Sequence, residues 1–143
     1  MEFGLISCTK LKLNHPVPPK ELYTKSAYFQ KARAYAEQHH DRWYILSAKH
    51  HLLEPDGPDI EPYDVTLNEA RKADRRVWAT SVAEQMDEHG LLQPNVTLVI
   101  HAGRAYYDEL LPLLPDDQQI CIPTEGLQFG ETLSWYNEPL DEE

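Results

Sequence analysis

The sequence predicts an α/β fold: a three-layer, Rossmann-like domain with a four-stranded, mainly parallel sheet flanked by helices. Short apolar, β-prone runs alternate with longer helical segments, four times over along the chain. This alternation is typical of parallel strands joined by right-handed crossovers, which bring the carboxyl ends of all strands to one edge. Three of the runs stop at polar side chains, and ligands bind at that edge in open sheets.

Strands are expected at residues 3–6, 43–46, 96–100 and 120–122, in the order 2-1-3-4 across the sheet. Each run is apolar, too short for a helix, and bounded by polar or turn residues. The second run carries most of the functional argument, because Ser47, Lys49, His50 and His51 follow it within a few residues. The others are followed by residues 7–10, 101–104 and 124–126.

Helices are expected at residues 27–39, 67–89, 105–111 and 131–136. Thr24 or Ser26 can cap the first helix, Gly90 is placed to end the second, and prolines stop the third. The second helix is expected to bury the stripe Ala70, Val77, Trp78, Val82 and Met86. Residues 54–66 contain three prolines and a glycine, so they form a long loop of the kind that often serves as a functional lid.

Length and composition indicate one domain at residues 1–137, followed by an acidic tail at residues 138–143. The chain has no apolar run of about 18 residues and its start lacks a basic signal region, so we expect a cytoplasmic protein without a membrane span. Its two cysteines are expected to be reduced. The net charge, 13 − 24 = −11, disfavours broad nucleic-acid binding but permits a local basic pocket.

The residues that follow the strands predict a polar small-molecule site. The candidate catalytic residues are Asp64, Glu125, Lys49 and His50. The candidate ligand-binding residues are Ser7, Cys8, Thr9, Lys10, Tyr23, Ser47, Tyr63, His101, Gly103, Arg104 and Gly126. No metal site is predicted, because the histidines and cysteines lack a ligand spacing. No cofactor is predicted either, because the GxGxxG and P-loop patterns are absent.

Several of these residues have a structural interpretation that the sequence leaves open. Ser7 and Thr9 can cap turns, and Cys8 can be a small buried hydrophobe instead of a nucleophile. One of the adjacent pair His50 and His51 is expected to face the pocket and the other to face away. Lys25, Lys31 and Arg33 form either a basic rim or an ordinary solvated helix face.

Six ordered segments resemble a microbial family of small domains of unknown function, which is distantly similar to the YaaA peroxide-stress proteins. The matching residues are 6–10, 21–23, 45–50, 61–64 with 66–67, 101–103 with Tyr107, and 125–127 with Gly130. The resemblance implies a layout like that of uracil-DNA-glycosylase-like α/β domains. One departure is His51, at a position where the family usually has glycine.

The layout implied by this resemblance raises the expectation of a nucleobase, nucleoside or modified nucleic acid as the partner. Our first hypothesis is an enzyme that cleaves or exchanges an N-glycosidic bond. Asp64 or Glu125 would stabilise the oxocarbenium-like sugar or activate water, and Lys49, His50 or Lys10 would stabilise the base anion or bind phosphate. Tyr23 or Tyr63 could stack on the base. The alternatives are a non-catalytic nucleotide or modified-base binding module and a protein-interaction domain.

Overall fold

The protein is built around a five-stranded sheet in the order β3-β2-β1-β4-β5. A computed structural model describes residues 1–141, with side chains through Asn137. The strands are β1 (Glu2–Ser7), β2 (Arg42–Ser47), β3 (His51–Leu53), β4 (Thr97–His101) and β5 (Gln119–Cys121). All neighbours pair in parallel except β2 and β3. The predicted order of the four parallel strands is confirmed, and β3 adds a fifth strand at the edge.

The missed strand β3 forms a hairpin with β2, and its short length explains why the sequence did not reveal it. The antiparallel register joins Ile45 to Leu53 and Ser47 to His51. His51, the first residue of β3, has a φ of 65°, in the left-handed region that favours glycine. The polar residues after β2 therefore form a tight turn instead of opening into a crossover.

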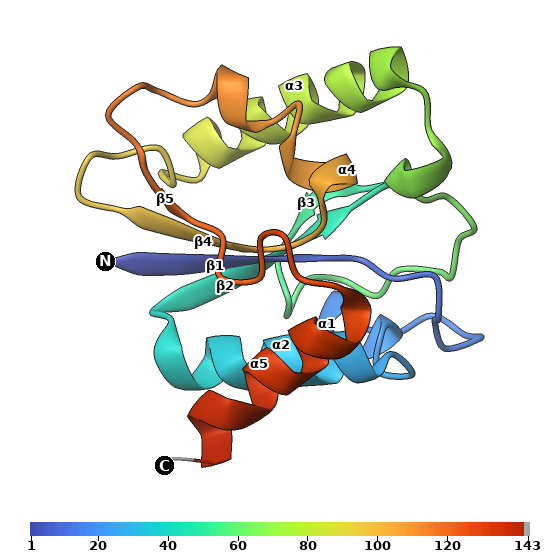
Figure 1. Ribbon diagram of the computed structural model, residues 1–143. Helices are drawn as coiled ribbons and strands as arrows, with labels where there is room; N and C mark the ends of the chain where they lie inside the picture. Colours follow the sequence, from blue (N-terminus) through green and yellow to red (C-terminus); the bar gives the residue numbers. More distant parts are fainter. Residues whose placement is uncertain (142–143) are drawn as a thin grey trace.

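Helices cover both faces of the sheet (Figure 1). The helices are α1 (Pro19–Leu22), α2 (Ala27–His39), α3 (Lys72–Glu88), α4 (Arg104–Tyr107) and α5 (Phe129–Asp141). Figure 1 shows α3 and α4 on one face and α1, α2 and α5 on the other. Two single 3-10 turns, η1 (Leu67–Glu69) and η2 (Leu111–Leu113), complete the fold. The predicted α/β class with a mostly parallel sheet is confirmed.

The helix ends follow local capping chemistry. Ser26 caps α2, because its side chain accepts a hydrogen bond from the backbone N–H of Phe29 at 3.2 Å. Gly90 follows α3 with a φ of 76°, which places a left-handed residue where helices commonly end. The predicted bounds of α2 and the terminating role of Gly90 are confirmed.

Four helix predictions need correction, and one of them is the third helix, predicted at 105–111, which is the short α4 followed by η2. The predicted helix at 67–89 is divided into η1 and α3, because Ala70 and Arg71 adopt extended backbone between them. Val77 faces solvent with 69 % exposure, and Ala79 takes its place in the buried stripe of α3. The last helix is longer than predicted, because α5 begins at Phe129 and its backbone continues to Asp141, within the segment expected to be an acidic tail; residues 142–143 lie outside the described part.

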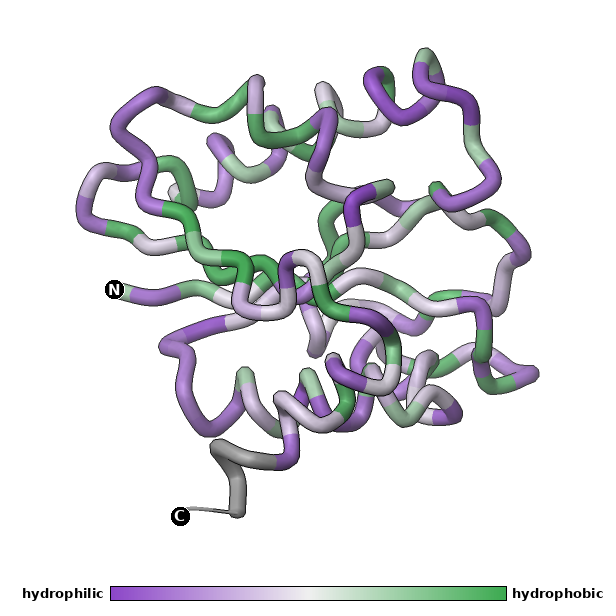
Figure 2. The backbone as a smooth tube through the Cα atoms, in the orientation of Figure 1, coloured by the Kyte–Doolittle hydropathy of each residue, from purple (hydrophilic) through white to green (hydrophobic). Residues whose placement is uncertain are grey.

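The core lies on both sides of β1, whose residues from Phe3 onward are all buried. Figure 2 shows the hydrophobic residues gathered along the central strands, with hydrophilic residues on the outer turns. Between the sheet and the α2–α5 pair, Tyr35 packs against Trp135 and Tyr136 with ring centroids 5.0 and 5.8 Å apart. No helix in the described part of the chain is both long enough and apolar enough to cross a bilayer.

Candidate functional site

A cavity of about 640 Å³ lies at the carboxyl end of β1 and β4. The end of β1 and the loop after it contribute residues 7–11, and the segment that enters α2 contributes residues 25–28. Ala102, Gly103 and Tyr106 enter from the β4–α4 connection. The position agrees with the rule that open parallel sheets bind ligands at the edge where the strands end.

The rest of the lining comes from residues farther along the chain. Thr124 reaches the cavity from the loop after β5, Asn68 from η1, Leu127 from the turn before α5, and Phe129 and Thr132 from the start of α5. Phe129 is 67 % exposed and Leu127 is 37 % exposed, so both offer apolar surface beside the opening. The lining thus combines hydroxyls and cations with apolar and aromatic surface.

The side chain of Cys8, which lines this cavity, has two hydrogen-bond partners. The backbone N–H of Ala48 donates to its Sγ at 3.3 Å, and the hydroxyl of Tyr106 lies 3.3 Å from the same sulfur. The backbone N–H of Cys8 donates to the carbonyl of Leu46 at 2.9 Å, which continues the β1–β2 pairing by one residue. The sulfur therefore faces the cavity from a fixed position.

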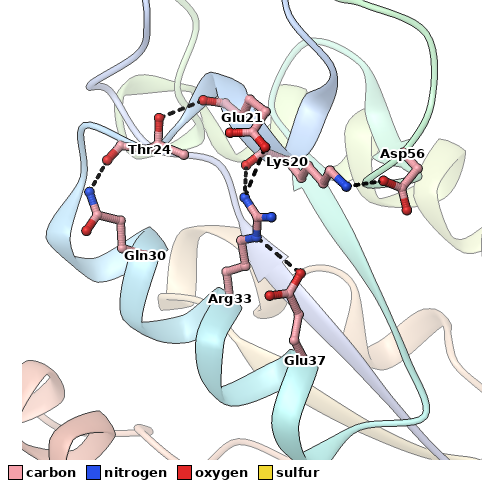
Figure 3. A network of polar contacts seen from close by, with 7 residues as sticks. All are labelled: Lys20, Glu21, Thr24, Gln30, Arg33, Glu37 and Asp56. Atoms are coloured by element: carbon pink, nitrogen blue, oxygen red, sulfur yellow. Dashed lines mark hydrogen bonds and ion pairs between the residues drawn. The ribbon is translucent and has the colours of Figure 1, made fainter.

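The basic residues before and within α2 do not all face the cavity. Residues 10–33 contain six cations and one carboxylate. Figure 3 shows Arg33 between Glu21 and Glu37, at 3.6 and 3.2 Å, and Lys20 paired with Asp56. Lys31 donates to the side-chain oxygen of Asn137 at 2.6 Å. These residues connect structural segments.

Lys10 and Lys25 line the cavity, and Lys12 lies close by. The ammonium group of Lys12 sits 4.5 Å from the centre of the Tyr63 ring and donates to the carbonyl of Lys10 at 3.4 Å. Burial lowers the pKa of Lys12, and negative charge at Cys8 or Asp64 opposes that effect. The positive charge at the cavity is therefore local and comes from Lys10, Lys12 and Lys25. Of the three residues considered as a basic rim, Lys25 alone lines the cavity.

A second polar network lies beneath the turn between β2 and β3. The hydroxyls of Tyr23 and Tyr63 are 2.6 Å apart, and the Tyr63 hydroxyl is 2.8 Å from that of Ser47. The backbone N–H of His50 donates to Ser47 at 2.9 Å. Tyr23 and Ser47 are completely buried, so this network holds the lid-like loop onto the sheet and does not line the cavity.

The imidazole of His101 points away from the cavity, toward the layer formed by α2 and α5. Its Nε2 lies 2.8 Å from Nε2 of His40, and its Nδ1 lies 2.7 Å from the hydroxyl of Tyr136. Burial lowers the pKa of His101 to about 3, and positive charge on His40 acts in the same direction. Burial also lowers the pKa of His40, with the nearby Glu2 carboxylate opposing the shift.

Tyr28, which lines the cavity, and Tyr136, which does not, connect the cavity to this buried layer. The Tyr28 hydroxyl donates to the backbone carbonyl of His101 and lies in hydrogen-bonding reach of Ser7. Tyr136 lies in hydrogen-bonding reach of Thr124 and Tyr28. Burial raises the pKa of both tyrosines, so both hydroxyls stay protonated at neutral pH.

The structure brings together some of the predicted site residues and separates others. Those that line the cavity are Ser7, Cys8, Thr9, Lys10 and Gly103. Those outside its lining are Tyr23, Ser47, Lys49, His50, Tyr63, Asp64, His101, Arg104, Glu125 and Gly126. Lys49, Asp64 and Glu125 are exposed to solvent. Among the described residues, no carboxylate lines the cavity.

Two physical causes explain these departures. The turn into β3 carries Lys49 and His50 along the edge of the sheet, whereas a crossover would have placed them over it. The helix after Gly103 is only four residues long, and the Arg104 guanidinium turns to Asp108 at 3.1 Å. Among the described residues, no group of three or more histidine, cysteine, aspartate and glutamate side chains is placed to hold a metal ion.

Sequence reasoning missed Tyr28, Tyr106 and Thr124 as site residues. Tyr28 carries a readable signal, because it stands two positions after the Ser26 cap at the start of a helix that follows β1. Thr124 lies in a loop after a predicted strand, and only its neighbours Glu125 and Gly126 were singled out there. Tyr106 is recognisable only from its contact with Cys8 across 98 residues of sequence.

Comparison with known proteins places the chain in a family without assigning a reaction. It is 29 % identical to "Uncharacterized protein YfjM" of Bacillus subtilis (strain 168) over 145 aligned positions, covering 96 % of this chain and 94 % of that protein. No solved structure matches the chain. Residues 4–138 match a family of unknown function, DUF6884, and the protein belongs to that family.

Proposed function

We propose that the cavity binds a small nucleotide. The phosphate lies at Lys10 and Lys25, and the base lies against the apolar surface of Leu127 and Phe129. The observation that carries this proposal is the joint presence in one cavity of Lys10 and Lys25, of several hydroxyls, and of the exposed Phe129 ring. A volume of about 640 Å³ is typical of pockets that enclose small organic ligands. A nucleotide fits this combination, because lysine ammonium groups bind phosphate and an aromatic ring stacks on a flat base.

The charge distribution favours a mononucleotide over a long nucleic acid. The whole chain carries a formal charge of −11, and several basic residues of the first third pair with carboxylates or an amide. The cations left at the cavity suffice for one phosphate group but do not form a continuous track for a polynucleotide backbone.

Isothermal titration calorimetry with AMP, adenosine and inorganic phosphate tests the proposal. We expect AMP to bind more tightly than adenosine, because the lysines contact the phosphate. The double variant Lys10→Gln/Lys25→Gln is expected to weaken AMP binding roughly tenfold or more while changing adenosine binding little. Lys72→Gln serves as the matched control, because Lys72 belongs to α3, outside the cavity.

Two results would contradict nucleotide binding. One is the absence of any heat change and any thermal stabilisation with AMP at millimolar concentration. The other is AMP binding that Lys10→Gln/Lys25→Gln and Lys72→Gln weaken equally, because such a result would assign the effect to net charge instead of to the cavity.

N-glycosidic cleavage or base exchange stays a separate prediction. The reaction needs a carboxylate at the sugar, and the candidates are Asp64 and Glu125. Both lie outside the cavity lining, so the geometry supports binding more directly than this reaction. The YaaA-like resemblance and the glycosylase-like layout likewise stay predictions. Mass-spectrometric detection of free base from a nucleoside or nucleotide would support the reaction, and its persistence in Asp64→Asn/Glu125→Gln would remove these residues from it.

A further inference from the structure

The edge of the sheet that β5 forms has no partner strand in the described part of the chain. β5 pairs with β4 from Thr97 opposite Gln119 to Val99 opposite Cys121, and it is the last strand on that side. All three residues of β5 are exposed, and the apolar Ile120 among them is 37 % exposed. An edge strand presents backbone N–H and C=O groups with which another extended chain can pair.

Side-chain contacts anchor β5 to its surroundings, so this edge is a fixed surface. The side chain of Gln119 accepts a hydrogen bond from the Thr97 hydroxyl at 2.9 Å and donates to the carbonyl of Pro94 at 3.0 Å. The buried Gln118, directly before β5, donates to the carbonyl of Val96 at 2.6 Å. A strand that is already anchored need not be ordered when a partner binds, which lowers the entropic cost of binding.

Negative charge is concentrated in the part of the chain that contains this edge. Residues 105–143 contain ten carboxylates and no lysine, arginine or histidine, so almost all of the formal charge of −11 lies there. Asp116 and Asp117 come just before β5 and Glu125 comes four residues after it, and all three are exposed. Within the described part of the chain, no lysine or arginine forms an ion pair with these three carboxylates.

The sign of this charge decides which kind of strand fits the edge. If two copies of the chain paired through β5, the acidic flanks of one copy would lie near those of the other, and like charges oppose such pairing. An extended segment rich in lysine or arginine would meet opposite charge at both ends of β5. Opposite charge speeds the encounter of two partners and helps to set their register.

We propose that β5 is a docking edge for an extended, basic segment of a partner protein, which adds a sixth strand to the sheet. Backbone hydrogen bonds hold the segment in place, and its cations face Asp116, Asp117 and Glu125. An apolar side chain of the segment covers the exposed part of Ile120. The lining of the nucleotide cavity includes no residue of β5, so this inference and the proposed function can fail independently.

Fluorescence anisotropy with three capped heptapeptides tests the proposal. In the first, lysine alternates with valine and stands at both ends. The second has the same sequence with the backbone nitrogens of two adjacent central residues methylated, and the third has glutamate in place of every lysine. Adjacent N–H groups of a strand point to opposite sides, so methylation removes one that faces β5 in either register.

We expect the methylated peptide to bind at least roughly tenfold more weakly than the first, and the glutamate peptide not to bind. Equal binding of the first two peptides would leave charge attraction alone and overturn strand pairing. If the first peptide does not bind at millimolar concentration, the whole inference is overturned, and nucleotide binding is untouched by that result.

Two matched double variants locate the surface that the first peptide contacts. Asp116→Asn/Asp117→Asn removes two charges beside β5 at nearly constant volume and is expected to weaken binding roughly fivefold or more. Glu84→Gln/Asp87→Asn makes the same change in net charge on the exposed side of α3 and should alter the affinity less than about twofold. An equal loss in both would assign binding to overall charge and exclude the edge as its site.

Cys121 gives a readout that a paired strand alone produces. Cys121 is exposed on β5, whereas Cys8 is buried. Versions of the first peptide carry an activated disulfide at one position after another, and the Cys121 thiolate displaces the activating group. Because strand side chains alternate between two faces, we expect cross-linking at every second position and none in Cys121→Ser. Cross-linking without this alternation would contradict the added strand.

Sedimentation of the protein with and without the first peptide tests the other occupant of the edge. We expect no dimer that forms through β5, because the acidic flanks repel one another. A dimer that the first peptide dissociates would place a second copy of the chain at this edge and overturn the assignment to a basic partner.

Discussion

Gly4 shows how a single residue in β1 can control the buried layer beneath the candidate site. A Cβ atom added at this position would lie 2.5 Å from Cδ2 of His40, well inside van der Waals contact. The imidazole cannot easily move away, because it is completely buried and contacts both Glu2 and His101. The need for glycine here is therefore steric and comes from the approach of His40.

Replacement of Gly4 by alanine should therefore destabilise the protein. We expect the free energy of unfolding to fall by about 1–3 kcal/mol, as for other overpacked cores, and the NMR signals of His40 and His101 to shift. Urea denaturation measures the first effect. Gly130→Ala is the control, since a Cβ there meets nothing within 4 Å and Gly130 lies in α5. An equal loss in both variants would argue against the steric explanation.

The buried histidine pair makes stability depend on pH in a direction that its environment determines. The folded-state pKa of His101 is lowered to about 3 from an ordinary value of 6.5, chiefly by burial. Above pH 6.5 the imidazole is neutral in both states. As the pH falls below 6.5, the unfolded chain takes up a proton that the folded protein does not, so the free energy of unfolding decreases.

We expect His101 to reduce the free energy of unfolding by about 1 kcal/mol between pH 6.5 and about pH 5.5, with His40 adding to the effect. Urea titrations at several pH values measure it. His101→Gln should make this pH dependence shallower, because glutamine does not titrate, whereas the exposed His15→Gln should not. A stability that stays constant from neutral pH to about pH 5.5 would contradict the neutral, buried state of the pair.

At the scale of elements, the β2–β3 hairpin determines which residues reach the cavity. His51 begins β3 with a φ of 65°, a conformation that glycine adopts without strain and other residues adopt at a cost. The resemblance to the family had pointed to this position, because the family usually has glycine there. Histidine in place of glycine at position 51 therefore adds a side chain and also places a non-glycine residue in a left-handed backbone conformation.

Substitution His51→Gly is expected to stabilise the protein by up to about 1 kcal/mol, because the left-handed backbone then carries no side-chain penalty. His51→Val is expected to destabilise it by more than about 1 kcal/mol, because β-branched residues fit this region poorly. Thermal denaturation of the three proteins gives the ranking. A valine variant as stable as the glycine variant would mean that the turn adopts another conformation.

At the scale of the whole molecule, charge restricts which nucleic-acid ligands can be bound. Within the part of the chain that the structure describes, a few lysines around the cavity have no carboxylate partner, whereas the chain as a whole has a formal charge of −11. We expect a single-stranded oligonucleotide to bind no more tightly than a mononucleotide, as measured by fluorescence anisotropy and calorimetry. Much tighter oligonucleotide binding with a steep dependence on salt would instead indicate a continuous backbone track.

The sequence by itself determined the layered α/β architecture, the strand order of the parallel part and the edge at which the site lies. These features follow from the alternation of apolar runs with helical segments, and from Ser26 and Gly90 at helix ends, because each depends on near neighbours in the chain. The residues at the end of β1, from Ser7 to Lys10, line the cavity, because a strand end moves little relative to its own strand.

Only the tertiary structure decided which other residues complete the site. Ser47 and Lys49 lie outside the cavity because a three-residue strand forms a hairpin after β2. His101 lies outside it because its ring turns toward His40. Tyr106 meets Cys8 across 98 positions of sequence, and His101 meets His40 across 61. Contacts of this range leave no periodicity in a single sequence, because they arise only when separate elements pack against one another.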